Sequence, residues 1–94
     1  MVKNRHYFYV LQCKDGSFYA GYTNNIEERI RKHNAGKGAK YTRAKRPVTL
    51  LHFEEYETKT EAMQAEYRFK QLKRSEKEKV VGMEGKENEA TEEL

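Results

Sequence analysis

The chain has 94 residues, of which 36% are charged and 12% aromatic, with no Trp, so we expect one polar domain with a small core. Its formal net charge is +4, but residues 83–94 hold five Glu and one Lys, which leaves +8 on residues 1–82. A basic body favours a polyanionic partner such as nucleic acid, although many small basic proteins have none. The acidic segment at residues 83–94 has no core residues and is predicted to be disordered.

Cysteine content and hydropathy limit the environment of the protein. The single Cys13 can form no intrachain disulfide, and as a buried thiol it fits a reducing cytoplasm. Residues 1–6 lack the apolar run of a signal peptide, and no segment is apolar enough to span a membrane. We therefore expect a cytoplasmic protein without a membrane partner.

A β-hairpin is predicted at residues 7–21. Its flanks, residues 7–13 and 17–21, are rich in aromatic and β-branched side chains, and the Lys-Asp-Gly sequence at residues 14–16 is a turn signal. The length of the turn decides which side chains share a face of the hairpin.

Two registers of this hairpin are open from the sequence. A two-residue turn would place Gln12 opposite Tyr19, with Tyr9 on the other face. A three-residue loop that ends in a left-handed Gly16 would place Leu11 opposite Tyr19, and Tyr9 would then share its face. We favour the three-residue loop, because glycine suits its third position. Two phenols on one face would make a site, although most strand tyrosines only pack.

A short helix is predicted between Asn24 and Gly36. Asn24 followed three residues later by Glu27 is a capping-box pattern, and Gly36 can end the helix. Arg29 and His33 are four residues apart, so they share one side of this helix. We expect a guanidinium and an imidazole one turn apart, close to the hairpin.

A basic loop is predicted at residues 37–47, which include five cations and no acidic residue and lack helical or strand periodicity. Cations around one aromatic side chain suit a nucleic-acid backbone and a base, whereas a plain solvated loop is the simpler alternative. The candidate nucleic-acid-binding residues are Lys37, Lys40, Tyr41, Arg43, Lys45 and Arg46.

Residues 48–56 form the third predicted strand. The cluster of Leu50, Leu51 and Phe53 favours a central position in the sheet with cover on both faces. The predicted order is strand, strand, helix, strand, helix, helix. This order indicates an α+β domain over residues 1–82, with a three-stranded antiparallel sheet flanked by helices.

Two further helices follow the third strand. The first covers residues 60–74 and begins with a capping box of Thr58 and Glu61. A similar box at residues 75–78 opens a last short helix, which Gly82 ends.

Glu66 borders the apolar stripe of the long helix. The stripe consists of Ala62, Ala65, Phe69 and Leu72. A carboxylate at its border is ordinarily solvated or paired with a lysine one turn away, here Lys70.

An ordered set of residues resembles the GIY-YIG nuclease superfamily. Residues 7–9, Tyr-Phe-Tyr, stand at the first motif, and residues 19–21, Tyr-Ala-Gly, stand at the second. Arg29 follows the second tyrosine by ten residues, His33 lies four further on, and Glu66 falls in the next long helix. The resemblance covers residues 5 to about 82 and is strongest to the small stand-alone bacterial members, many of them uncharacterised.

The resemblance implies a metal-dependent DNA endonuclease. Tyr9 and Tyr19 would match the motif tyrosines, one of which orients or deprotonates the attacking water. Arg29 would stabilise the phosphate charge, and His33 would hydrogen-bond a tyrosine or assist proton transfer. Glu66 would be the single protein ligand of one Mg²⁺ or Mn²⁺ ion. We expect Arg29, His33 and the metal to act as cations that lower the tyrosine pKa from about 10.

The sequence departs from the family pattern in ways that support a second hypothesis. No Asn follows Glu66 before Gly82, where many family nucleases have one, and Ala20 replaces an Ile. No DNA-binding domain is appended to the predicted domain. The alternative is a catalytically weak or inactive nucleic-acid-binding module, with DNA or RNA as its ligand and an unidentified protein partner for targeting. The first hypothesis is a structure-selective endonuclease in DNA repair or recombination.

Overall fold

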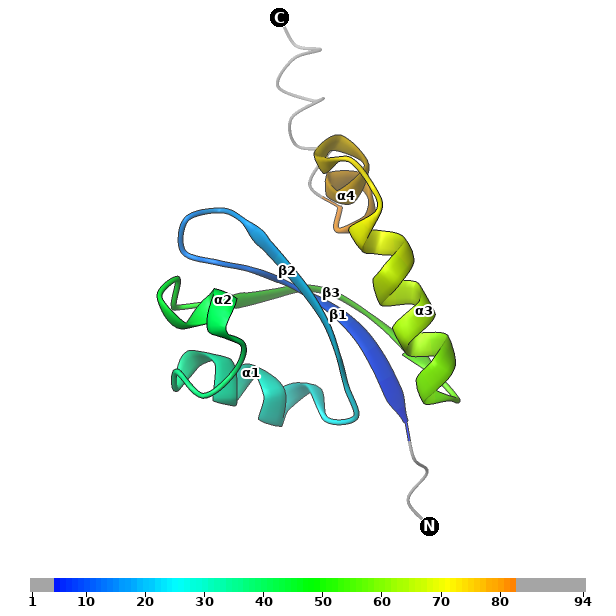
Figure 1. The fold of residues 1–94 in the computed structure, drawn as a ribbon, viewed down its shortest axis with the longest axis horizontal. Coiled ribbons are helices and arrows are strands. Elements are labelled where there is room, and N and C mark those ends of the chain that lie inside the picture. The colour runs from blue at the N-terminus through cyan, green and yellow to red at the C-terminus, as the bar shows by residue number, and fades with distance from the viewer. Residues whose placement is uncertain (1–4, 83–94) are drawn as a thin grey trace, which may run out of the picture.

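Seven elements follow one another within residues 5–82, the part of the chain that the computed structural model in Figure 1 describes. In chain order they are β1 (His6–Gln12), β2 (Phe18–Thr23), α1 (Ile26–Asn34), α2 (Lys40–Arg43), β3 (Thr49–Tyr56), α3 (Lys59–Lys70) and α4 (Arg74–Val80). The strands form one antiparallel sheet in the order β2-β1-β3. The predicted α+β class and antiparallel sheet are confirmed, and the segment predicted as a loop contains the one-turn helix α2. The prediction of disorder at 83–94 lies outside the described residues.

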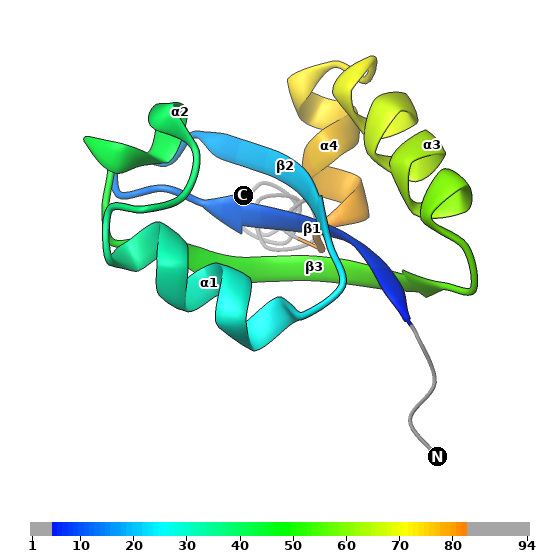
Figure 2. The same cartoon turned by 60° about the horizontal axis from the view of Figure 1, so that its bottom comes forward.

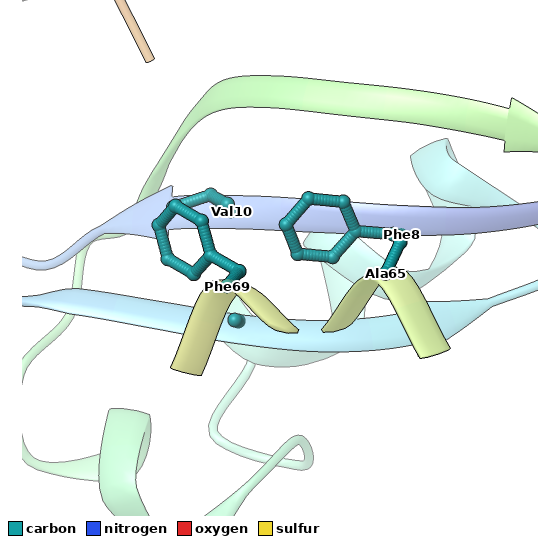
Figure 3. Packing of buried hydrophobic residues seen from close by; sticks show 5 residues of the cluster. Phe8, Val10, Ala65 and Phe69 are labelled. Carbon is teal, nitrogen blue, oxygen red and sulfur yellow. The ribbon is translucent and has the colours of Figure 1, made fainter. Parts of the chain in front are cut away.

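Helices cover both faces of the sheet, with α1 and α2 on one face and α3 and α4 on the other (Figures 1 and 2). Because side chains alternate along a strand, β1 supplies residues to both cores. Phe8 and Val10 pack with Ala65 and Phe69 of α3 (Figure 3). Tyr9 points the opposite way, toward α1, and is only 1% exposed. The central strand therefore holds a phenol in the interior of the molecule.

The hairpin has the three-residue loop that the sequence favours. Gly16 has a φ of 88°, and its N–H donates to the carbonyl of Cys13, a buried free cysteine, at 2.9 Å. Leu11 lies opposite Tyr19 in the register of β1 and β2. Tyr9 and Tyr19 consequently share a face of the sheet, as the predicted site requires.

β3 is an edge strand, so the prediction of a central position is wrong. β1 lies between β2 and β3, and Phe53 is 49% exposed. The Phe53 ring packs edge-on against Tyr7, with 5.9 Å between the ring centroids. The apolar side chains of β3 therefore pack beside β1, and Phe53 among them stays half exposed.

The first helix begins one residue later than predicted. Asn25, and not Asn24, caps α1, with its side chain accepting the Glu28 N–H at 3.1 Å. Either asparagine could cap, but the Thr23 hydroxyl accepts the Asn25 N–H at 3.1 Å and fixes the turn before the helix. Gly36, with a φ of 81°, follows the helix end as predicted.

The boundary between α3 and α4 also differs from the prediction. Thr58 caps α3 as expected, accepting the Glu61 N–H at 3.1 Å, but the helix ends four residues early. The Glu76 carboxylate accepts the Lys73 N–H at 3.0 Å, so the cap of α4 lies two residues before the predicted one. None of the helices within residues 5–82 has the length and hydropathy needed to cross a membrane.

Replacing Phe69 by Ala should lower the free energy of unfolding by about 3 kcal/mol, because Phe69 is 4% exposed between α3 and the sheet. Tyr67→Ala is the matched control on the same helix, since Tyr67 is 65% exposed and should change stability by less than ~0.5 kcal/mol. Urea unfolding followed by circular dichroism measures both values. Equal losses would contradict this assignment of the buried side of α3.

Candidate active site

Three of the predicted site residues meet on the face of the sheet that α1 covers. Tyr9 comes from β1, while Arg29 and His33 lie one turn apart on α1. The Tyr9 hydroxyl lies 3.0 Å from His33 Nε2, and Arg29 Nε donates to the same hydroxyl at 3.3 Å. The predicted spacing of four residues therefore brings a guanidinium and an imidazole to one phenol.

Thr42, which the sequence analysis did not single out, completes this hydrogen-bonded chain. Its hydroxyl donates to the Ala39 carbonyl at 3.0 Å and lies 2.8 Å from His33 Nδ1. Because the Thr42 proton is committed to Ala39, we assign the Nδ1 proton to His33, which donates to Thr42. Nε2 is then the acceptor, and the Tyr9 O–H donates to it. Both His33 and Thr42 are 0% exposed.

Burial makes both members of the Tyr9–His33 pair neutral near pH 7. It raises the pKa of Tyr9 to about 12, against the opposing effect of the Arg29 hydrogen bond. It lowers the pKa of His33 to about 4, and the Arg29 charge adds to the effect. The expectation of a cationic His33 that lowers a tyrosine pKa is therefore wrong, because desolvation outweighs the charged neighbours. Arg29 is the cation of this group, and its pKa is raised chiefly by the hydrogen bond to Tyr9.

Tyr19 lies beside this chain on the half-buried edge strand β2. Its ring is 6.4 Å from the Tyr9 ring and meets His33 edge-on at 5.2 Å between centroids. On α2, the Tyr41 ring stacks on Tyr19 at 6.1 Å with 23° between the planes. The two motif tyrosines thus differ in access, with Tyr9 enclosed and Tyr19 open to a ligand.

Two glycines make room for the central pair. A Cβ at Gly21, opposite Tyr9 in the β1–β2 register, would lie 2.6 Å from the Tyr9 hydroxyl oxygen. A Cβ at Gly38 would lie 2.4 Å from His33 Nδ1. Both contacts are far shorter than van der Waals separation, so the hydrogen-bonded rings require glycine at these positions. The last residue of the Tyr-Ala-Gly motif therefore has a steric role.

Glu66 belongs to the opposite layer, on α3. Its carboxylate, 17% exposed, forms a 2.7 Å ion pair with Lys70, the ordinary partner that the sequence suggested. Its charge nevertheless reaches Tyr9, where it adds to the effect of burial in raising the pKa. Lys70 lines a pocket together with Tyr19 and Tyr41, so α3 approaches the tyrosines around the free edge of β2.

The available protein ligands suit a metal ion whose remaining ligands are supplied by water or by the substrate. Within residues 5–82, no group of three or more His, Cys, Asp or Glu side chains could enclose an ion. Mg²⁺ commonly binds through one or two carboxylates, with waters and substrate phosphates completing its shell. Glu66 as a single carboxylate ligand fits that habit.

The six predicted nucleic-acid-binding residues divide into two groups. Lys45 is held by Asp15 at 3.3 Å and lies 3.9 Å above the Tyr41 ring. Arg46 donates to the Arg43 carbonyl at 2.7 Å, so it has a structural role in the turn after α2. The remaining candidates are exposed, and they are Lys37, Lys40, Tyr41 and Arg43.

The comparisons with known proteins agree with this arrangement. Residues 5–79 match the family described as the GIY-YIG catalytic domain. The chain belongs to the GIY-YIG catalytic domain family. A UPF0213 protein of Bacillus velezensis is 60% identical over 90 residues, which cover 96% of this chain and 91% of the relative. The UPF0213 protein YazA of Bacillus subtilis is 57% identical over 81 residues, or 86% of this chain and 82% of the relative.

Solved structures show the same fold. The solution structure of a UPF0213 protein from Bacillus halodurans is 48% identical, covers 96% of both chains and has a TM-score of 0.56. The solution structure of an Enterococcus protein, from E. faecalis, is 52% identical over 85% of both chains, with a TM-score of 0.58. The GIY-YIG resemblance read from the motif residues is thereby confirmed.

The buried neutral His33 should make the protein less stable in mild acid. Its pKa of about 4 lies below the ordinary 6.5, so the unfolded chain binds more protons between these values. The free energy of unfolding should therefore fall by about 3 kcal/mol as the pH drops from 6.5 to 4. His33→Gln should flatten this dependence in urea titrations. Imidazole ¹⁵N NMR measures the site directly, and a pKa at or above 6.5, or an Nε2–H tautomer, would contradict the assignment.

Proposed function

We propose that this protein is a metal-dependent endonuclease that hydrolyses phosphodiester bonds in DNA, with selectivity for DNA structure and a role in repair or recombination. The observation that carries the proposal is the buried chain from Arg29 through Tyr9 to His33, beside the open Tyr19. Membership of a family of catalytic domains supports it. The arrangement supplies an anchor for phosphate, oriented oxygens and a proton acceptor.

Arg29 binds the scissile phosphate in this proposal. Its Nε–H donates to Tyr9, which fixes the plane of the guanidinium, and Tyr19 also contributes to raising its pKa. Guanidinium groups match two phosphate oxygens at once, and Lys cannot reproduce that geometry. The pKa of Arg29 is raised from a value that is already high, so its charge is present near neutral pH.

Tyr9 and Tyr19 orient the attacking water, and His33 is the acceptor of its proton through Tyr9. With its pKa raised to about 12, Tyr9 is no base on its own, but it already donates its proton to His33 Nε2. A bound phosphate offsets the Arg29 charge that helps to keep the pKa of His33 low. The imidazole therefore becomes a better acceptor when substrate is present. The open Tyr19 contacts the water or the phosphate from the solvent side.

Glu66 holds the Mg²⁺ or Mn²⁺ ion. When bound, such an ion polarises the phosphate and stabilises the leaving oxygen. In the free protein Lys70 neutralises this carboxylate at 2.7 Å, so Glu66 must exchange its lysine partner to act as a ligand. Until that exchange, the ion pair with Lys70 holds the largely buried Glu66 carboxylate in place.

Glu66→Gln and Arg29→Ala should each reduce metal-dependent nicking of supercoiled plasmid by about 100-fold or more, because the first weakens the proposed metal ligand and the second removes the cation that binds the phosphate. Glu61→Gln is the matched control, with the same charge change on an exposed position of α3. Circular dichroism verifies that all variants fold. Nicking at the wild-type rate in both site variants would overturn the proposal and point to a contaminating nuclease.

A nucleic-acid-binding module that does not cut is the second candidate. Exposed Lys37, Lys40 and Arg43 on a segment beside the site favour it, as does the lack of an Asn between Glu66 and Gly82. Such a module would bind DNA in a salt-dependent manner and would keep its affinity when Glu66 is replaced.

Replacing Lys37, Lys40 or Arg43 by Gln should lower DNA affinity and reduce the slope of log affinity against log salt by about 0.7 to 0.9 each. Lys59→Gln is the control with the same loss of one charge. Lys59 lies over the Tyr22 ring at the start of α3, and α3 covers the face of the sheet opposite to α2. Fluorescence anisotropy with labelled DNA at several salt concentrations measures the slope. An unchanged slope in all three variants would remove this segment from the interface.

A further inference from the structure

A pocket of about 330 Å³ lies at the free edge of β2, where the two helical layers meet. Its walls include Phe18, Tyr19, Tyr41, Phe69, Lys70 and Lys77. These residues come from β2, α2, α3 and α4, so the pocket is built from three separate parts of the sequence. It adjoins the candidate active site through Tyr19 and through Lys70, the partner of Glu66, and the phosphate chemistry assigned above uses none of its other walls.

The aromatic side of the pocket is ordered by contacts within the protein. Tyr41 is 45% exposed, and its ring stacks on Tyr19. The Lys45 ammonium lies 3.9 Å over the same ring and is itself held at 3.3 Å by Asp15 of the hairpin loop, so this ion pair fixes the Tyr41 ring. An exposed aromatic ring held by a cation and a second ring offers a preformed apolar wall.

The other side of the pocket is cationic. Lys70 and Lys77 come from α3 and α4, and no acidic residue within residues 5–82 lines the pocket. Its volume is at the lower end of the range of small-ligand sites, about 300 Å³ and above. A flat, apolar ring with attached negative charge complements these walls, and a nucleotide has that combination.

We propose that this pocket binds one unpaired nucleotide of the DNA substrate, with its base against the aromatic walls and its flanking phosphates at Lys70 and Lys77. The inference rests on the proposed function, because it places this nucleotide beside the scissile phosphate. A continuous duplex keeps its bases stacked and must spend unpairing energy to fill the pocket. DNA with an unpaired nucleotide beside the cleaved bond is therefore the preferred substrate class.

Lys70 links this pocket to Glu66. The same ammonium that pairs with the Glu66 carboxylate at 2.7 Å also lines the pocket. A phosphate bound by Lys70 competes with that carboxylate for the ammonium. Filling the pocket therefore releases Glu66 for its role as a metal ligand. Binding of the unpaired nucleotide, which selects the substrate, then precedes hydrolysis of the phosphodiester bond.

The test measures binding without metal, in EDTA, so that it is independent of cleavage. Three duplexes of one sequence are compared by fluorescence anisotropy: one with a single bulged nucleotide, one with an abasic bulge, and one continuous. We expect the bulged duplex to bind about ten-fold more tightly than the other two, the size of one base–aromatic contact. Tyr41→Ala should abolish this preference, and Tyr41→Phe should keep it.

A second pair of variants covers the cationic side. Lys77→Gln should weaken binding of the bulged duplex, whereas Lys79→Gln, two residues further on the same helix but absent from the pocket walls, should not. Equal affinity of the wild type for bulged and continuous duplex, or a preference that survives Tyr41→Ala, would overturn the pocket assignment. Cleavage without a preference for the bulged duplex would contradict the pocket assignment and leave the proposed nuclease activity standing. The predicted preference without any cleavage would contradict the nuclease activity and leave the pocket as part of a binding module.

Discussion

The hydrogen bond between the Tyr9 hydroxyl and His33 Nε2 is the contact on which the rest of the site depends. It joins the central strand to α1, and through Thr42 it extends to α2. Three elements are thereby locked by polar groups of residues that are at most 1% exposed, and such groups carry a large penalty if they lose their partners. The glycines at positions 21 and 38 are consequences of this bond, because any side chain there would displace one of its two rings.

The same burial that orders the pair also keeps it uncharged. A phenol with a pKa of about 12 beside an imidazole with a pKa of about 4 exchanges no proton at rest. Arg29 on α1 is then the charged member of this group, and its pKa is raised.

Some of this arrangement is encoded locally and some is not. The hairpin register follows from one loop glycine, and the shared side of Arg29 and His33 follows from helical spacing, so both were predictable. Thr42 was not, because its role depends on a nine-residue separation from His33 that no periodic pattern marks. The neutral charge state of His33 was also out of reach, because it depends on burial beneath α2, a one-turn helix with neither side-chain cap nor periodicity.

The strand order explains why side chains from two opposite layers meet at one edge of the sheet. If β2 were central, the sheet would separate Glu66 on α3 from the tyrosines on the α1 side. Because β2 is an edge strand and carries the small residues Ala20 and Gly21, no strand within residues 5–82 pairs with its outer side and blocks the approach of α3. The exposed edge, ordinarily a liability of a small sheet, is here the place where Lys70 meets the pocket of Tyr19 and Tyr41. The edge position of β2 therefore allows Tyr19 of the second motif to line a pocket together with side chains of both helical layers.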